Sequence, residues 1–326
     1  MENRKVNGVL GEKKSELLEQ LEMSVAALQK KAELRKGVYE PEQLTPKEIY
    51  KKLDENVFGQ EEAKKSLSVI LYEHMARCKM RGEGQHLRKM NAMLVGPTGC
   101  GKTLIAKTLS EIANVPYIKI DATSLVQRGY RGGMHCEQII NLLISAAGGA
   151  LRRAENGIVF IDELDKLACG SDMSGEIATE GVQYDLLSMI DGGQLFYEPD
   201  GSEYTRRKID MGNVLFLFGG AFSKIDSKAN TMSMARYGLM PEFIARIGSI
   251  INLQPLSEKV IRKLVEQHMD DYAHILPLSK HDKWVYSRLL TGAIINSGMH
   301  TILGGRAVGP MVRKFFKDKI FEIKRS

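Results

Sequence analysis

The sequence predicts an α/β protein with a parallel sheet flanked by helices and a smaller, mostly helical C-terminal domain. From Asn91 onward, short apolar runs alternate with helical patterns, which is typical of a parallel sheet covered on both faces. Beyond about Pro255 the chain shows only helical patterns joined by polar segments. A length of 326 residues also suits about two domains.

The chain divides into three predicted segments. Residues 1–44 form an N-terminal helical extension and linker, residues 45–254 a large α/β domain, and residues 255–326 a small helical domain. In the first segment, apolar residues recur at alternating spacings of three and four, as in a short coiled coil. This helix either packs on the body or a neighbour, or docks a partner.

The large domain begins with a helix-start pattern. Thr45-Pro46-Lys47-Glu48 places Thr at the cap, Pro at the first position and Glu three residues after the cap. Five later apolar runs are expected to be strands: Met93–Val95, Tyr117–Ile120, Ile158–Ile161, Val214–Phe218 and Ser249–Leu253.

The composition favours a soluble cytoplasmic protein. Apolar residues make up 43% and charged residues 26%, and 46 Lys plus Arg against 40 Asp plus Glu give a mild net charge of +6. No apolar run reaches the ~18 residues of a membrane span, and the N-terminus lacks the apolar segment of a signal peptide. The four cysteines are scattered, which argues against a disulfide framework or a structural zinc site.

A glycine-rich loop carries the strongest chemical signal. It reads Gly96-Pro97-Thr98-Gly99-Cys100-Gly101-Lys102-Thr103, follows an apolar strand and opens a helix. Glycines let backbone N–H groups surround phosphates, and the helix N-terminus adds positive potential. Lys102 is expected to reach the β- and γ-phosphates of ATP, and Thr103 to ligate Mg²⁺.

An acidic pair follows a second buried strand. Asp162 and Glu163 directly follow the apolar run Ile158–Ile161. In a parallel sheet, the carboxyl end of this strand is expected to lie beside the glycine-rich loop. Asp162 is expected to help hold Mg²⁺, and Glu163 to act as the general base on the attacking water. Cys100 is interpreted as a small residue whose backbone matters, with a redox-sensitive thiol as the alternative.

These motifs resemble the AAA+ family, most of all the ClpX-type unfoldases and next the HslU type. The resemblance runs from about Leu44 to Phe316 and rests on the segment Leu53–Lys64, the glycine-rich loop and the acidic pair. It implies an ATPase that binds ATP and Mg²⁺. Val57 and Phe58 fall where this family holds the adenine, and an apolar pair suits a flat base.

The resemblance also implies two arginines near the phosphates. Arg246, within the segment Gly238–Arg246, corresponds to the arginine finger that reaches the nucleotide of the next subunit. Arg306 follows Gly304-Gly305 and corresponds to a second sensor, which reports the nucleotide state as a change of angle between domains. A site completed by a neighbour implies a homo-hexameric ring.

The family places a pore loop at Gly129-Tyr130-Arg131-Gly132. Tyr130 would grip a polypeptide without needing a particular sequence, and protein substrates would be threaded through the ring. Arg131 stands where the family usually has Val, and we expect it to favour acidic or mixed-charge segments.

Two features of the family are missing from this sequence. It has no cysteines for the N-terminal zinc domain of ClpX-type proteins, so substrate selection is expected to differ. Between Phe222 and Gly238 it has no long insertion with an Ile-Gly-Phe tripeptide, so we expect no docking to a ClpP-type protease by that route.

Two alternatives remain open at this stage. One is a nucleic-acid motor or loader, with which the net charge and a basic C-terminal cluster are compatible, although an aromatic pore residue favours protein substrates. The other is a regulatory module that uses nucleotide only as a switch, against which Glu163 and Arg246 argue.

Overall fold

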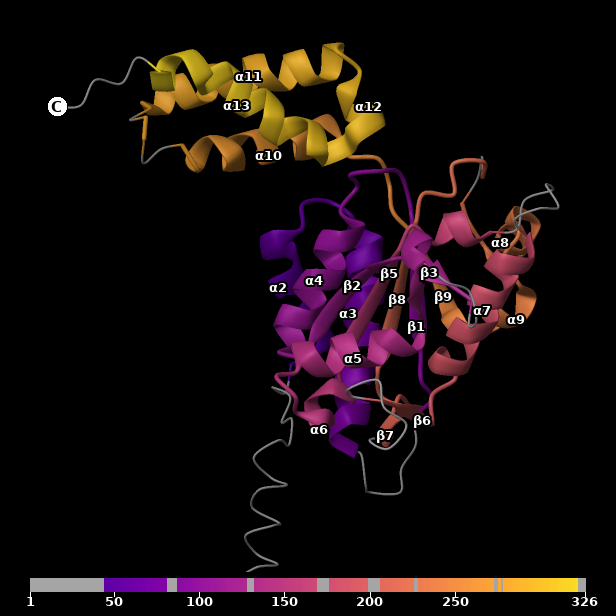
Figure 1. Cartoon of the computed structure of the whole chain (residues 1–326). Helices are drawn as coiled ribbons and strands as arrows, with labels where there is room; N and C mark the ends of the chain where they lie inside the picture. Colours follow the sequence, from indigo (N-terminus) through magenta and orange to yellow (C-terminus); the bar gives the residue numbers. More distant parts are fainter. Residues whose placement is uncertain are drawn as a thin grey trace, which may run out of the picture.

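The computed structural model describes residues 44–80, 87–127, 132–168, 176–198, 206–225, 228–272, 275–276 and 278–321, without the side chains of residues 176–178, 318 and 319. The predicted N-terminal helix therefore lies outside the described residues. Within these ranges a layered α/β unit carries a bundle of C-terminal helices at one end (Figure 1).

The elements follow the chain in this order. The helices of the α/β unit are α2 (Pro46–Asn56), α3 (Glu61–Met80), α4 (Lys102–Ala113), α5 (Glu137–Ala146), α6 (Leu151–Ala154), α7 (Glu176–Ile190), α8 (Thr231–Tyr237) and α9 (Pro241–Ile247). Its strands are β1 (Asn91–Val95), β2 (Tyr117–Asp121), β3 (Leu125–Val126), β4 (Met134–His135), β5 (Ile158–Asp162), β6 (Gln194–Tyr197), β7 (Arg207–Asp210), β8 (Leu215–Gly220) and β9 (Gly248–Asn252). Two short 3₁₀ turns are η1 (Ala122–Ser124) and η2 (Leu164–Leu167). The C-terminal elements are α10 (Glu258–Asp270), α11 (Lys280–Asn296), α12 (Met299–Leu303), η4 (Gly304–Ala307) and α13 (Val308–Phe321).

The central sheet has five strands in the order β2-β5-β8-β1-β9, and every neighbouring pair is parallel. All five predicted strands are present in it, so the predicted α/β class with a parallel sheet is confirmed. Two smaller pairs were not expected from the sequence. One is the parallel pair β3–β4, and the other is the antiparallel pair β6–β7.

Alternate residues of each central strand pack in two different hydrophobic cores, one on each face of the sheet. Ala92 and Leu94 of β1 pack with α2, α3 and α4 on one face, whereas Met93 and Val95 pack with α5, α7, α8 and α9 on the other. This period of two is what a buried parallel strand requires, because successive side chains point to opposite faces. The helices therefore cover both faces of the sheet (Figure 1).

The C-terminal helices have a core of their own. Its fully buried residues come from α10, α11, η4 and α13, and include Ile261, Ile294 and Phe316. The boundary proposed near Pro255 falls between β9 and α10 and stays a prediction. Within the described ranges, no helix combines the length and the apolar character that crossing a membrane requires.

Candidate functional site

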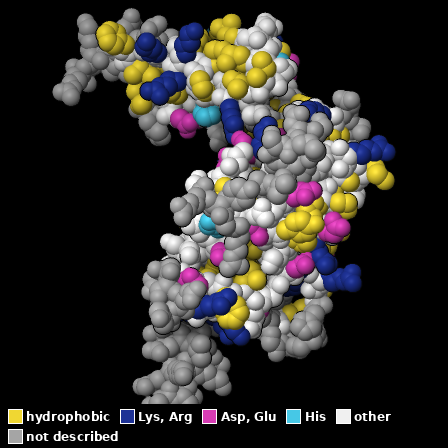
Figure 2. Space-filling model, turned by 45° about the vertical axis from the view of Figure 1, so that its right-hand side comes forward, with side chains coloured by type: hydrophobic (Ala, Val, Ile, Leu, Met, Phe, Trp, Pro, Cys, Tyr) yellow, Lys and Arg dark blue, Asp and Glu magenta, His cyan; other side chains and the backbone are white. Residues whose placement is uncertain are grey.

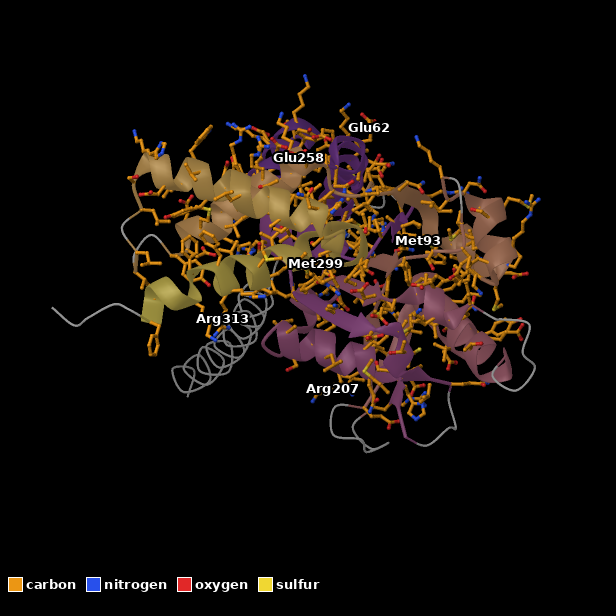
Figure 3. The ribbon with its side chains drawn as sticks, turned by 90° about the horizontal axis from the view of Figure 1, so that it is seen from above. Glu62, Met93, Arg207, Glu258, Met299 and Arg313 are labelled. Atoms are coloured by element: carbon orange, nitrogen blue, oxygen red, sulfur yellow. The ribbon has the colours of Figure 1, made fainter. Side chains whose placement is uncertain are left out.

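A cavity of about 550 Å³ lies where the carboxyl ends of the strands meet the C-terminal helices. Viewed from above, the helices that carry Glu258, Met299 and Arg313 lie to one side of Met93 on β1 (Figure 3). The predicted site residues that line the cavity are Val57, Phe58, Thr98, Gly99, Cys100, Gly101, Lys102, Thr103, Asp162, Glu163 and Arg306. Residues far apart in the sequence thus share one cavity.

Two glycines shape the loop between β1 and α4. Gly99 has φ +72° and Gly101 has φ +107°, a region that L side chains rarely adopt. A Cβ on Gly99 would lie 2.0 Å from the carbonyl oxygen of Leu303, so the loop also needs glycine there for space. Gly101 offers no side chain to cap α4, and an anion can take the place of that cap.

Lys102 folds back over this loop. Its Nζ donates hydrogen bonds to the carbonyl oxygens of Gly96 at 2.6 Å and Pro97 at 3.0 Å. Gly96 and Pro97 are therefore in contact with Lys102, although they do not line the cavity themselves. The ammonium lies at the loop that would surround the phosphates, where it can exchange carbonyl partners for anionic ones.

Asp162 and Thr103 meet across the sheet and α4. The Thr103 hydroxyl donates to Asp162 Oδ2 at 3.1 Å, and the backbone N–H of Glu163 donates to Asp162 Oδ1 at 3.1 Å. Burial alone would raise the pKa of Asp162, but the ion pair with Lys119 and these hydrogen bonds hold it below its usual value. Asp162 is therefore an anion at neutral pH.

The donor set fits a magnesium ion. A hydroxyl and an ionised carboxylate lie side by side at the wall of a cavity large enough for further ligands. Mg²⁺ prefers hard oxygen ligands and usually takes one or two from the protein, with the rest from phosphates and water. Thr103 and Asp162 would hold it.

Glu163 has a strained backbone at the rim of the cavity. Its φ of 59° and ψ of 33° are left-handed, a conformation that is uncommon for a residue other than glycine. Strain of this kind costs about 1–3 kcal/mol and collects at functional sites. The turn directs the chain from β5 into η2 directly beside Asp162.

Apolar groups also line the cavity. Val57 and Phe58 contribute from the end of α2, and Leu256, Val260 and Leu264 contribute from the C-terminal segment. The Lys263 Nζ lies 5.3 Å from the centre of the Phe58 ring. A flat, largely apolar group fits between these walls.

The C-terminal helices touch the glycine-rich loop directly. The backbone N–H of Gly305 donates to the carbonyl oxygen of Gly99 at 3.0 Å. Arg306, in η4, lines the cavity one residue further on. The loop and the bundle are therefore coupled at the cavity by a backbone hydrogen bond.

Arg246 lies elsewhere. It is at the end of α9, just before β9 begins beside Asn91 at the amino ends of the strands, and it does not line the cavity. Its Nε forms an ion pair with Asp191 Oδ1 at 2.5 Å, and its side chain is 60% exposed. The predicted pore residues Tyr130 and Arg131 lie outside the described residues.

Three residues that line the cavity or contact its lining residues were given no role from the sequence. Lys119 on β2 pairs with Asp162 at 3.0 Å. Asp165 is buried and accepts from the backbone N–H of Ala221 at 3.1 Å. Gln60 Nε2 donates to the carbonyl oxygens of Cys100 at 3.3 Å and of Gln254 at 2.7 Å. Only the position of Lys119 in an otherwise apolar run could have marked it.

Cys100 is a buried thiol in the glycine-rich loop. Burial raises its pKa above the ordinary value, even though Lys102 opposes that change. A thiol rather than a thiolate is present at neutral pH, which favours the structural role over the redox-sensitive alternative.

A parallel sheet with a glycine-rich loop, a helix and an acidic pair at its carboxyl edge defines a P-loop nucleotide-binding protein. Residues 87–250 match the family model for the AAA domain (Cdc48 subfamily). The chain therefore belongs to the AAA+ ATPases, and its relatives place it among the ClpX-like members.

Three relatives are ATP-binding subunits of ATP-dependent Clp proteases, named ClpX or ClpX 2. The chain is 33% identical to the ATP-dependent Clp protease ATP-binding subunit ClpX 2 of Wolinella succinogenes over 309 residues, which cover 85% of this chain and 77% of the relative. It is 32% identical to ClpX of Borrelia duttonii over 324 residues, which cover 86% of this chain and 75% of the relative. It is 35% identical to ClpX of Azotobacter vinelandii over 273 residues, which cover 70% of this chain and 62% of the relative. The chain is a nucleotide-binding ATPase.

Proposed function

We propose that this ATPase is an unfolding and remodelling chaperone that pulls protein substrates through a homo-hexameric ring. One observation carries the ATP-driven part of this proposal. Lys102, Thr103, Asp162, Glu163 and Arg306 come from separate parts of the chain and line one cavity between the α/β unit and the C-terminal helices. A hydrolysis site in that position can move one part relative to the other.

Each residue has a role in the proposed hydrolysis. Lys102 leaves the carbonyls of Gly96 and Pro97 for the β- and γ-phosphates, and the N-terminus of α4 supplies further donors. Thr103 and Asp162 hold Mg²⁺, which neutralises charge on the phosphates when bound. Glu163 accepts a proton from the attacking water, and Val57 and Phe58 contact the adenine.

We propose the ring because Arg246 lies on the surface, away from the nucleotide cavity of its own chain. A guanidinium that is 60% exposed is available to the nucleotide of a neighbouring subunit. Hydrophobic side chains also gather on the C-terminal helices (Figure 2), where Trp284, Leu289 and Ile302 are more than half exposed. Exposed apolar groups of this size suit a contact with a second copy.

Substrate movement is assigned to Tyr130 and Arg131 in the predicted pore loop. Arg306 and the Gly305–Gly99 hydrogen bond would convert loss of the γ-phosphate into a change of angle between the two parts. The relatives are described as ATP-binding subunits of Clp proteases. For this chain we propose a cytoplasmic remodeller that acts without a ClpP-type protease, because the Ile-Gly-Phe insertion is absent from its sequence.

The test uses Glu163→Gln in the full chain. The variant keeps the binding residues and loses the general base, so we expect ATP binding with turnover reduced at least about 100-fold. With ATP it should retain unfolded protein that the parent chain releases, and the retained proteins can be identified by mass spectrometry. Hydrolysis stimulated by DNA, with no retained protein, would favour the nucleic-acid motor instead. Degradation of a tagged substrate with added ClpP-type protease would contradict the absence of that partner.

A further inference from the structure

The cation nearest to the Asp162 carboxylate is a lysine from the edge strand of the sheet. Lys119 Nζ lies 3.0 Å from Asp162 Oδ2, the same oxygen that accepts from Thr103 Oγ1 at 3.1 Å. Asp162 Oδ1 accepts from the Glu163 N–H at 3.1 Å. Both carboxylate oxygens therefore already have donors.

The sheet register explains how Lys119 reaches this position. In the parallel pair β2–β5, Lys119 lies beside Phe160, two residues before the pair Asp121–Asp162. Paired residues point to the same face, and Phe160 packs in the core that includes α4. Lys119 and Asp162 thus share the face that carries Thr103. Among the described residues β2 is an edge strand of this sheet, and the long side chain of Lys119 is 42% exposed.

An ammonium in this position opposes a second cation. A metal held by Thr103 and Asp162 would lie within a few ångströms of Lys119 Nζ, and like charges at that distance repel even where solvent screens them. The Asp162 side chain is only 10% exposed, so screening there is weaker than at the open surface. Lysine has a flexible stem, so it can move away when a stronger ligand arrives.

We propose that Lys119 is a built-in counter-ion of Asp162 that competes with Mg²⁺ and sets the Mg²⁺ concentration at which the nucleotide site fills. This inference rests on the proposed assignment of Thr103 and Asp162 to the metal. Lys119 acts through the carboxylate and is a positioning residue, not a catalytic one. With the ammonium in place, the carboxylate attracts the metal less strongly than a free one.

The experiment measures metal binding without turnover. The full chain is mixed with a fluorescent ADP analogue, and Mg²⁺ is titrated to obtain the midpoint of the fluorescence change. Mn²⁺ binding to the same complex is followed by electron paramagnetic resonance. Lys119→Met removes the charge and keeps the length of the side chain, so we expect both midpoints to fall at least about threefold. Lys119→Arg keeps the charge and should stay within twofold of the parent chain.

Lys107→Met is the matched control. Lys107 is 63% exposed on α4, pairs with Glu111 at 3.5 Å and does not line the cavity. The Lys107→Met variant loses the same net charge as Lys119→Met, but at a site away from Asp162. Its Mg²⁺ midpoint should therefore stay within twofold of that of the parent chain. An unchanged or higher midpoint in Lys119→Met, with a melting temperature like that of the parent, would overturn the proposal. If the parent chain fails to bind the analogue at saturating Mg²⁺, the nucleotide site itself is wrong, which is a separate result.

Discussion

At the residue scale, the cavity depends on glycines that no other residue can replace without strain. Gly304 has φ +54°, and a Cβ there would lie 2.6 Å from the carbonyl oxygen of Thr98. Gly99 lies against Gly304, and a Cβ on Gly99 would clash with the carbonyl oxygen of Leu303. The close approach of two backbones is what lets the C-terminal helices touch the glycine-rich loop.

Gly304→Ala should therefore loosen this contact. We expect a loss of about 1–3 kcal/mol of stability, because the backbone conformation is strained for alanine and the new Cβ meets a carbonyl. Thermal unfolding with and without ADP should show a lower melting temperature and a smaller shift on adding nucleotide. Gly292→Ala is the control. It lies within α11 with nothing within 4 Å of the new Cβ, so it should gain about 1 kcal/mol.

At the element scale, α2 and α3 are fixed by local signals and by buried polar contacts. In α2 the Thr45 hydroxyl accepts from the Glu48 N–H at 3.3 Å, and Glu48 Oε2 accepts from the Thr45 N–H at 2.7 Å. This capping box confirms the predicted helix start. In α3 the buried Lys64 pairs with Asp54 of α2 and donates to the carbonyl oxygen of Val57 at 3.1 Å. These contacts hold the chain that leads to Val57 and Phe58 at the cavity.

Thr45→Ala should destabilise α2 by about 1 kcal/mol, because the first N–H groups lose their acceptor. Chemical denaturation followed by circular dichroism measures this change. Lys47→Ala, an exposed position in the same turn, should change the free energy of unfolding by less than half as much. Equal losses in the two variants would show that the cap contributes nothing.

His74 makes α3 sensitive to acid. Its Nε2–H donates to the carbonyl oxygen of Asn156 at 3.1 Å, and burial, followed by the charge of Arg77, lowers its pKa to about 3. An unfolded chain binds a proton at His74 near pH 6.5, whereas the folded chain does not until about pH 3. The contribution of neutral His74 to stability is therefore complete above pH 6.5 and falls as the pH drops.

His74→Gln should reduce the loss of stability between pH 6.5 and pH 5, by up to about 2 kcal/mol. Urea unfolding at a series of pH values measures the slope. His281→Gln, at an exposed position, should keep the slope of the parent chain. A His74→Gln slope that matches the parent would rule out His74 as the source.

At the scale of the whole molecule, the cavity joins two parts that have separate cores. Gln60 ties the glycine-rich loop to Gln254, just before the C-terminal helices, by hydrogen bonds in both directions. The backbone N–H of Gly305 donates a second link, to the carbonyl oxygen of Gly99. A nucleotide bound between these contacts affects both parts at once. Arg246 remains outside, held by Asp191.

A mixing experiment tests the proposed ring. Arg246→Ala should bind nucleotide normally, because its own cavity is intact, yet turn over at least about 100-fold more slowly. Glu163→Gln should also be slow. When the two are mixed, some cavities combine a native Glu163 with a native Arg246 from a neighbour, so ATPase activity should reappear. A mixture no more active than its components would contradict completion of the site by a second subunit.

The sequence by itself determined the central sheet and most of the cavity, because these are encoded locally. Apolar runs of the right length form buried strands. The glycine-rich loop and the acidic pair each occupy consecutive positions directly after a strand. Because the strands are parallel, both motifs were expected at the same edge of the sheet. The tertiary structure decided what depends on residues far apart in the chain. Lys119 reaches Asp162 only through the β2–β5 register, and Gly305 reaches Gly99 only because the C-terminal helices return to the loop. No spacing along the chain specifies such contacts, because side chains and backbones from separate elements meet only when the elements pack.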